Sequence, residues 1–370
     1  MSVPLIDLGR QHEPLADEIR EIFDRIVRTS SFILGEEVDR FEEQLAAYAG
    51  TKFAIGVTSG TDALLMALMA LDIGPGDEVI TSPFTFFSTA GAISRVGAKP
   101  VFVDINPRTY NLRWELIEGA ITEKTKAIMP VHLFGLSAQM DKIMEIAKRH
   151  DLKVIEDAAQ ALGAKFDDRM VGSIGDIGCY SFYPTKNLAA MGDAGALVTN
   201  DGELACRLRR LRVHGMDDVD HFSEVGGNFR LDSLKAAILA FKLPLLDGYA
   251  RRRRAHADRY GQQLESLPIG TPFEAETRYH VYNQYTIRVH GGAREPLRHH
   301  LTACGIGNRI YYSRPLHLQP CYADLGQGEG SLPAAEEAAQ EVLSLPVFPE
   351  LTHDEQQQVI DAIRDFCRAE

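Results

Sequence analysis

Lys186 lies in a segment whose residue types could support amine chemistry, Ser181-Phe-Tyr-Pro-Thr-Lys-Asn187. The proline constrains the turn, so the lysine amine is aimed rather than free in water. A poorly solvated amine loses basicity and can form imines with carbonyl compounds. Ser181 could donate a hydrogen bond to a phosphate. For this segment alone, a lysine on a surface loop is the simpler interpretation.

Two neighbouring acids stand in Val154-Ile-Glu-Asp-Ala-Ala-Gln160, at the end of an expected strand. Ligands of open α/β sheets bind at the carboxyl ends of the strands. A carboxylate there could keep a pyridine nitrogen protonated and so make the ring an electron sink. The alternative is that Glu156 and Asp157 cap the next helix.

The segment Thr58-Ser-Gly-Thr-Asp62 connects an expected strand to a helical run over 63–71. Free N–H groups at a helix start can bind an anion such as phosphate. The alternative is an ordinary cap, in which the hydroxyl groups satisfy those N–H groups. Gly192 and Gly195 indicate a tight turn or a close approach. Along the chain, the three segments supply a phosphate cradle, a ring-nitrogen acid and an imine-forming lysine, in that order.

Other common signatures are absent from the sequence. There is no Gly-x-Gly-x-x-Gly, no phosphate-binding Gly-x-x-x-x-Gly-Lys-Ser/Thr loop, no Gly-x-Ser-x-Gly and no His-Glu-x-x-His. These absences disfavour a nicotinamide-dependent oxidoreductase and the usual hydrolases.

The chain from about 50 to 245 alternates short apolar runs with helical stretches, which predicts an α/β domain with a mostly parallel sheet. The runs are 53–57, 78–81, 100–104, 127–131, 153–156, 179–182 and 196–199. Helices are predicted over 15–28 and 36–48. We expect residues 1–245 to form an N-terminal segment with the large domain, and residues 246–370 a smaller α+β domain. The latter should contain a strand at 285–289 and helices near 295–304 and 354–368.

Composition narrows the class of protein further. The 39 basic and 52 acidic residues give a net charge of −13, which disfavours binding to nucleic acid. The basic run 251–254 is interpreted as a solvated helix face. We expect no membrane span, a cytoplasmic location and no metal, because the five cysteines form no Cys-x-x-Cys pair.

The sequence resembles the nucleotide-sugar aminotransferases named after the DegT, DnrJ, EryC and StrS proteins. The resemblance covers nearly the whole chain and includes the segments 4–8, 32–38, 59–64, 74–79, 315–320 and 343–349. It implies the aspartate-aminotransferase-like fold (fold type I) with a seven-stranded sheet, and pyridoxal 5′-phosphate (PLP) as cofactor. It also implies a homodimer with its two active sites at the interface.

The resemblance also implies a role for individual residues. Lys186 would carry PLP as a Schiff base and move the proton, while Asp157 would bind the ring nitrogen and Gln160 the ring hydroxyl. Phe86 would stack on the ring. The phosphate would be held by Gly60, Thr61 and Ser181, and by Asn228 from the neighbouring subunit.

Lysine at position 186, where some relatives carry histidine and dehydrate sugars, favours transamination. The segment 186–196 is similar to members that aminate C3 of a 3-keto sugar, with glutamate as the usual donor. Contacts to donor and sugar are expected from Tyr183, Arg230, Tyr311, Tyr312 and His317. Ser313 stands where the family usually has proline, which leaves the sugar contacts open.

Two alternatives stay open on the sequence. One is a cyclitol aminotransferase that acts on an inosose with the same machinery. The other is a PLP-binding regulator with little turnover. The sequence does not identify the nucleotide, the sugar, the amine stereochemistry or any assembly beyond a dimer.

Overall fold

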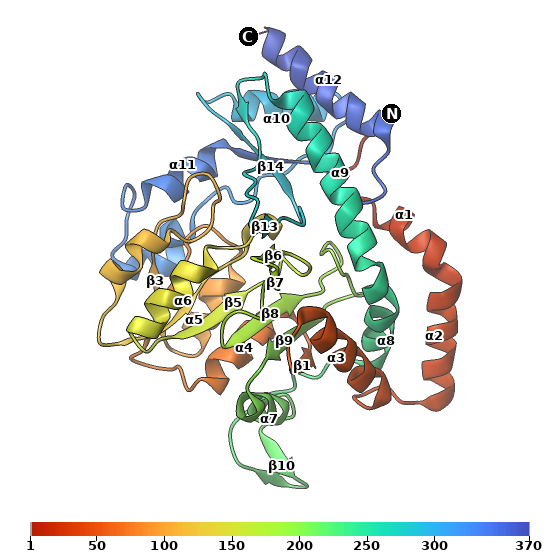
Figure 1. Cartoon of the computed structure of the whole chain (residues 1–370), viewed down its shortest axis with the longest axis vertical. Helices are drawn as coiled ribbons and strands as arrows, with labels where there is room; N and C mark the ends of the chain where they lie inside the picture. Colours follow the sequence, from red (N-terminus) through yellow and green to blue (C-terminus); the bar gives the residue numbers. More distant parts are fainter. Residues whose placement is uncertain (1, 370) are drawn as a thin grey trace.

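The computed structural model describes residues 2–369 and is built around a seven-stranded sheet (Figure 1). The order across the sheet is β3 (Lys99–Phe102), β2 (Glu78–Thr81), β4 (Thr125–Met129), β5 (Lys153–Asp157), β8 (Ile177–Ser181), β9 (Gly195–Thr199) and β1 (Phe53–Val57). β9 pairs antiparallel with β8 and β1, and the other neighbours are parallel. Each strand overlaps one predicted apolar run, so the predicted mostly parallel sheet is confirmed.

Both faces of this sheet are covered, which explains why its strands are apolar without alternation. In β9, Ala196 and Val198 join one core, while Leu197 between them joins a second core on the opposite face. The first core is completed by α3 (Glu36–Ala49) and α8 (Ser233–Lys242). The second core includes α4 (Gly60–Ala70) and α7 (Gly202–Leu211). Two further helices of this half are α5 (Ser88–Arg95) and α6 (Met140–Arg149).

The C-terminal part forms its own core around an antiparallel sheet. This sheet has the order β12 (Ile269–Gly270), β14 (Tyr285–Val289) and β15 (Val342–Leu345). The helices of this part are α9 (Leu246–Leu264), α10 (Arg294–Ala303), α11 (Pro333–Glu341) and α12 (His353–Ala369). In Figure 1, α9 runs from α8 toward α12, and both chain ends lie near α12. Val3 also enters this core and bridges to Ile306. A boundary at 245/246 stays a prediction.

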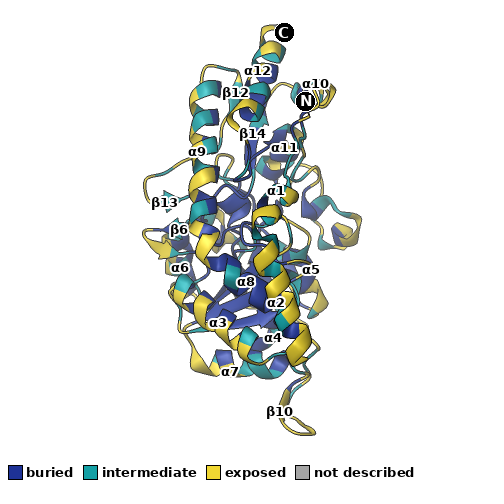
Figure 2. Ribbon diagram, turned by 90° about the vertical axis from the view of Figure 1, so that its right-hand side faces the viewer, coloured by how far each residue is buried: buried dark blue, intermediate teal, exposed yellow. Residues whose placement is uncertain are grey.

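Several smaller elements complete the fold. They are α1 (Leu8–His12), α2 (Ala16–Thr29), β6 (Lys165–Phe166), β7 (Arg169–Met170), β10 (Met216–Asp218), β11 (His221–Phe222) and β13 (Arg278–Tyr279). The α2 and α3 bounds match the predicted helices within a residue or two. The β10–β11 hairpin projects from the body and is largely exposed (Figure 2). No helix of residues 2–369 is both long and apolar enough to cross a membrane.

The interpretation of the basic run 251–254 as a solvated face is wrong for one of its members. Arg253 is 2% exposed, and its guanidinium donates to the carbonyl oxygens of Tyr282 and Val347. The charge is buried because α9 lies over these chain segments and their carbonyl groups need donors. Arg251 and Arg252 are exposed, as expected.

Candidate active site

The carboxyl ends of the parallel strands meet at one edge of the large sheet, and the predicted chemical residues follow these ends. Thr58 follows β1, Ser82 follows β2, and His132 lies just beyond β4. Asp157 is the last residue of β5 and Ser181 the last residue of β8. β5 and β8 are parallel neighbours, and β1 runs in the same direction on the far side of β9, so three chain-distant segments are brought to one edge of the sheet.

Asp157 is 4% exposed and is held from two directions. Its Oδ2 accepts a hydrogen bond of 2.8 Å from Thr89 Oγ1, and its Oδ1 accepts one of 3.2 Å from the Ala159 N–H. Burial raises the pKa of Asp157, while these hydrogen bonds and the charge of Lys186 act in the opposite direction. A carboxylate kept out of water in this way interacts strongly with any cation placed beside it.

Glu156, one residue earlier, is fully buried and belongs to a different network. His132 Nδ1 accepts from the Ala138 N–H, so Nε2 carries the proton and donates to Glu156 over 2.9 Å. The Glu156 oxygens also accept from the N–H groups of Gly172, Ile174 and Gly175. Burial raises the pKa of Glu156, but these donors outweigh it and the pKa is lowered overall.

The alternative interpretation of this acidic pair as a helix cap is wrong. No helix begins at residues 158–164, which form turns. Glu156 instead anchors the loop over residues 172–175, and Asp157 points to the Lys186 side of the sheet edge.

Lys186 lies in the loop that joins β8 to β9, and its N–H donates to the Tyr183 carbonyl oxygen over 2.8 Å. Desolvation lowers the pKa of the Lys186 amine to about 8, against the opposing charge of Asp157. A larger fraction of neutral amine at ordinary pH favours attack on a carbonyl carbon. The interpretation as an ordinary surface lysine is therefore not supported.

The start of α4 is pressed closely against the ends of β8 and β9. A Cβ atom on Gly60 would lie 2.6 Å from Ser181 Cβ, and one on Gly195 would lie 2.4 Å from the Ser59 carbonyl carbon. Ser59 caps the helix by accepting from the Asp62 N–H, so the cap interpretation holds for that residue. The N–H groups of Gly60 and Thr61 have no intrahelical acceptor, as at any helix start. Thr61 Oγ1 contacts Ser88 Oγ at 2.7 Å.

Gln160 connects two walls of the site. Its Oε1 accepts from the Phe134 N–H over 2.7 Å, and its Nε2 donates to the Tyr312 hydroxyl over 3.1 Å. The Tyr312 ring lies 6.5 Å from the Phe86 ring, centroid to centroid. Phe86 is 58% exposed, which is unusual for a large apolar side chain beside a buried polar group.

The predicted substrate residues fall into two groups. Tyr183 is exposed, Arg230 is half-buried, and Arg230 Nε has no hydrogen-bond partner among residues 2–369. Asn228, which was predicted to contact the phosphate of the cofactor rather than the substrate, is exposed in the same segment as Arg230. The Phe229 carbonyl oxygen accepts from the Thr58 N–H, which places this segment beside the start of α4. His317, in contrast, is 1% exposed and its Nε2 bonds to Glu336 over 3.1 Å. His317 is thus part of an internal pair.

Sequence reasoning missed three residues that support this site: Ser88, Thr89 and His132. The signal for the first two was the hydroxyl-rich segment that follows β2, Ser82-Pro-Phe-Thr-Phe-Phe-Ser-Thr89. His132 gave no signal in the sequence, because its partner Glu156 is 24 residues away.

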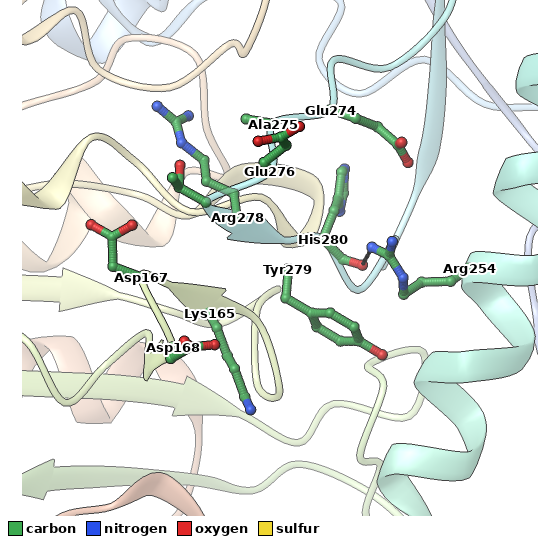
Figure 3. Close-up of a pocket in the computed structure, with 11 residues that line it drawn as sticks. Lys165, Asp167, Asp168, Arg254, Glu274, Ala275, Glu276, Arg278, Tyr279 and His280 are labelled. Atoms are coloured by element: carbon green, nitrogen blue, oxygen red, sulfur yellow. Dashed lines mark hydrogen bonds between the residues drawn. The ribbon is translucent and has the colours of Figure 1, made fainter.

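A polar pocket of about 660 Å³ lies elsewhere, between the β6–β7 hairpin, the loop before β13 and α9 (Figure 3). Its lining includes Lys165, Asp168, Glu276 and Arg254, and Arg254 donates to the His280 carbonyl oxygen. None of the predicted site residues lines it. No cluster of three metal-ligating side chains occurs in the described part of the chain.

The fold and the residues at its sheet edge define a fold type I aminotransferase that depends on PLP. The chain belongs to the DegT/DnrJ/EryC1/StrS aminotransferase family, whose pattern matches residues 14–364.

Curated and solved relatives match over almost the whole chain. The chain is 52% identical to the "Pleiotropic regulatory protein" of Geobacillus stearothermophilus, covering 100% of this chain and 99% of that protein. It is 46% identical to a "UDP-N-acetyl-3-dehydro-alpha-D-glucosamine 3-aminotranferase" of Acidithiobacillus ferrooxidans, covering 98% and 97%. The crystal structure of DesV from S. venezuelae with a ketimine intermediate superposes with a TM-score of 0.96, at 43% identity and 99% and 98% coverage.

Proposed function

We propose that this protein transfers an amino group from glutamate to the C3 keto group of a nucleotide-linked sugar. The observation that carries the proposal is the buried Asp157 beside Lys186, an amine whose pKa is lowered to about 8. The relative from A. ferrooxidans is named as a 3-aminotransferase of a UDP-linked 3-dehydro sugar, which supports both the substrate class and the position.

The residues present fit PLP on three observations. The crowded contact of Gly60 and Gly195 with their neighbours brings the start of α4 to the sheet edge, where its N–H groups could hold a phosphate with Thr61 and Ser181. Asp157 would bind the ring nitrogen, and Gln160, already fixed by Phe134, would meet the ring hydroxyl. The exposed Phe86 ring would be covered by stacking on the cofactor.

PLP, when bound, supplies the ring that stabilises negative charge at the reacting carbon. The protein then supplies binding and proton transfer. Lys186 would hold the cofactor, and once released its amine would take the proton from the donor carbon and deliver it to the cofactor carbon. Asp157 would keep the ring nitrogen protonated, and Thr89 would fix the orientation of this carboxylate.

The substrate groups would be held at the exposed rim. Arg230 is suited to an anionic group because its Nε is buried without an acceptor. Tyr183 and Tyr311 could reach hydroxyl groups, and Tyr312 is held in place by Gln160. We leave His317 out of this set because Glu336 and the interior already occupy it.

A homodimer with active sites at the interface is part of the proposal. Phe23, Phe32, Ile33 and Met191 are each more than 40% exposed and line one apolar groove beside α2 and α8. Apolar exposure of this kind is typical of a protein interface. Asn228 is exposed and is therefore open to a neighbouring subunit. A cytoplasmic location stays a prediction.

The test is a transamination assay with purified protein and PLP. Glutamate and a UDP-linked 3-keto sugar should give 2-oxoglutarate and the 3-amino sugar, whereas the 4-keto isomer should react poorly. Turnover of an inosose but not of any nucleotide sugar would replace the proposal with the cyclitol alternative.

A second candidate is a PLP-binding regulator, favoured by the name of the G. stearothermophilus relative. The same assay separates the two, since a regulator would bind PLP and show no amino transfer with any keto sugar tested.

A further inference from the structure

The loop over residues 182–194 carries Lys186 and is closed by several bonds. The Phe182 N–H donates to the Ala194 carbonyl oxygen, and the Ala190 N–H donates to the Phe182 carbonyl oxygen, both over 2.8 Å. The Asn187 amide donates to the Val281 carbonyl oxygen over 3.2 Å. A further bond comes from Lys242, the last residue of α8, whose Nζ donates to the Ala189 carbonyl oxygen over 2.7 Å.

Lys242 is an unusual residue for its place. It is 0% exposed, and no carboxylate lies within 4.0 Å of its Nζ among residues 2–369. Its second neighbour is His12 Nε2 of α1, at 3.4 Å. Desolvation lowers the pKa of Lys242 to about 8, and the more distant Glu350 opposes this shift. Burying an ammonium group without a counter-ion is costly, whereas methionine would fill the same space without that cost.

We propose that Lys242 is a positioning residue, which fixes the loop of Lys186 through the Ala189 carbonyl oxygen and ties it to α1 through His12. Ala189 is three residues from Lys186, and residues 187–190 are all buried, so the backbone between the two residues is packed inside the protein. Among residues 2–369, the charge-assisted bond to Ala189 is the one hydrogen bond that joins Lys242 to this loop. This inference rests on the proposed role of Lys186.

The first test is hydrogen exchange on the full-length protein without cofactor. In Lys242→Met, the Ala190 amide should exchange about tenfold faster or more, because a charge-assisted hydrogen bond that holds the loop is lost. Amides of β8, such as that of Tyr180, should be unchanged. The matched control is Lys235→Met on the same helix: its Nζ pairs with Asp232 over 2.7 Å, and only its aliphatic stem borders the loop, near Gly192.

The second test is the rate at which the visible band of bound PLP forms. It should fall about tenfold in Lys242→Met with the final amount bound unchanged, since the amine is less well placed rather than absent. Lys242→Gln keeps an N–H donor without the charge, and its Ala190 amide should also exchange faster than in the native protein. This variant tests the positioning role if Lys242→Met does not fold.

If the Ala190 amide of the folded Lys242 variants exchanges at the same rate as in the native protein, the positioning role is overturned. A native protein that forms no PLP band would overturn the role of Lys186, and the exchange result would still report on the loop.

Discussion

Glu156 and Asp157 are neighbours on β5, yet their carboxylates lie in different hydrogen-bond networks and their pKa values shift in opposite directions. On one side, Glu156 accepts from His132 and three backbone N–H groups, and its pKa is lowered. On the other side, Asp157 accepts from Thr89 and one backbone N–H, faces Lys186 and has a raised pKa. Strand alternation separates the two networks. A buried carboxylate such as Glu156, whose oxygens are fully hydrogen-bonded, stabilises the fold. A buried carboxylate such as Asp157, which can accept further hydrogen bonds, can bind a ligand.

The largest effect should come from the cation that faces Asp157. Lys186→Ala removes both the cofactor anchor and the proton carrier, so kcat should fall by at least about 10³-fold. Steady-state transamination measures this, and circular dichroism should show an unchanged fold. Retention of more than a tenth of the native rate would contradict the assignment.

Asp157→Asn tests the ligand side of the strand. The amide keeps the size but loses the charge that would hold the ring nitrogen protonated, so kcat should drop roughly 10²- to 10³-fold. Thermal stability should change little or increase, because an ionised buried group is removed. A large loss of stability with normal kcat would show that Asp157 stabilises the fold and does not take part in catalysis.

The pH dependence of PLP binding should follow the Lys186 amine. Since its neutral form attacks, the rate of band formation should rise about tenfold per pH unit below the folded pKa and level off above it. The expected midpoint is about 8. Stopped-flow absorbance of the protein mixed with PLP gives this profile, and a rate still rising at pH 10 would show that the amine is not desolvated.

Glu156→Gln is the matched partner of Asp157→Asn and should have the smallest effect on catalysis. The kcat of folded protein should stay within about twofold, while the free energy of unfolding falls by about 1–3 kcal/mol as buried donors lose their acceptor. Because the pKa of Glu156 is lower in the folded protein than its unfolded value of 4.5, the ionised carboxylate stabilises the fold at pH values above 4.5. This stabilisation is lost as the pH falls through the folded pKa.

Urea unfolding at pH 7 and pH 4 should therefore show a larger drop on acidification for the native protein than for Glu156→Gln. An equal drop in the free energy of unfolding for the two proteins would show that ionised Glu156 does not contribute to stability against acid.

The sequence predicted what local pattern governs. Seven apolar runs became seven strands, and residues at their ends, such as Asp157 and Lys186, came together because parallel strands share an edge. Long-range pairing was out of reach. The pairs His132–Glu156, His317–Glu336 and Lys242–Ala189 depend on contacts that no spacing rule encodes. Arg253 was misjudged for the same reason, because its acceptors come from distant segments.

The most direct test of the central claim is to trap the cofactor on the chain. PLP is added, the imine is reduced with borohydride, and the digested peptides are identified by mass spectrometry. The account predicts a phosphopyridoxyl group on Lys186, and none on the corresponding peptide of Lys186→Ala. A label on another lysine, or no label on the native protein, would contradict the account.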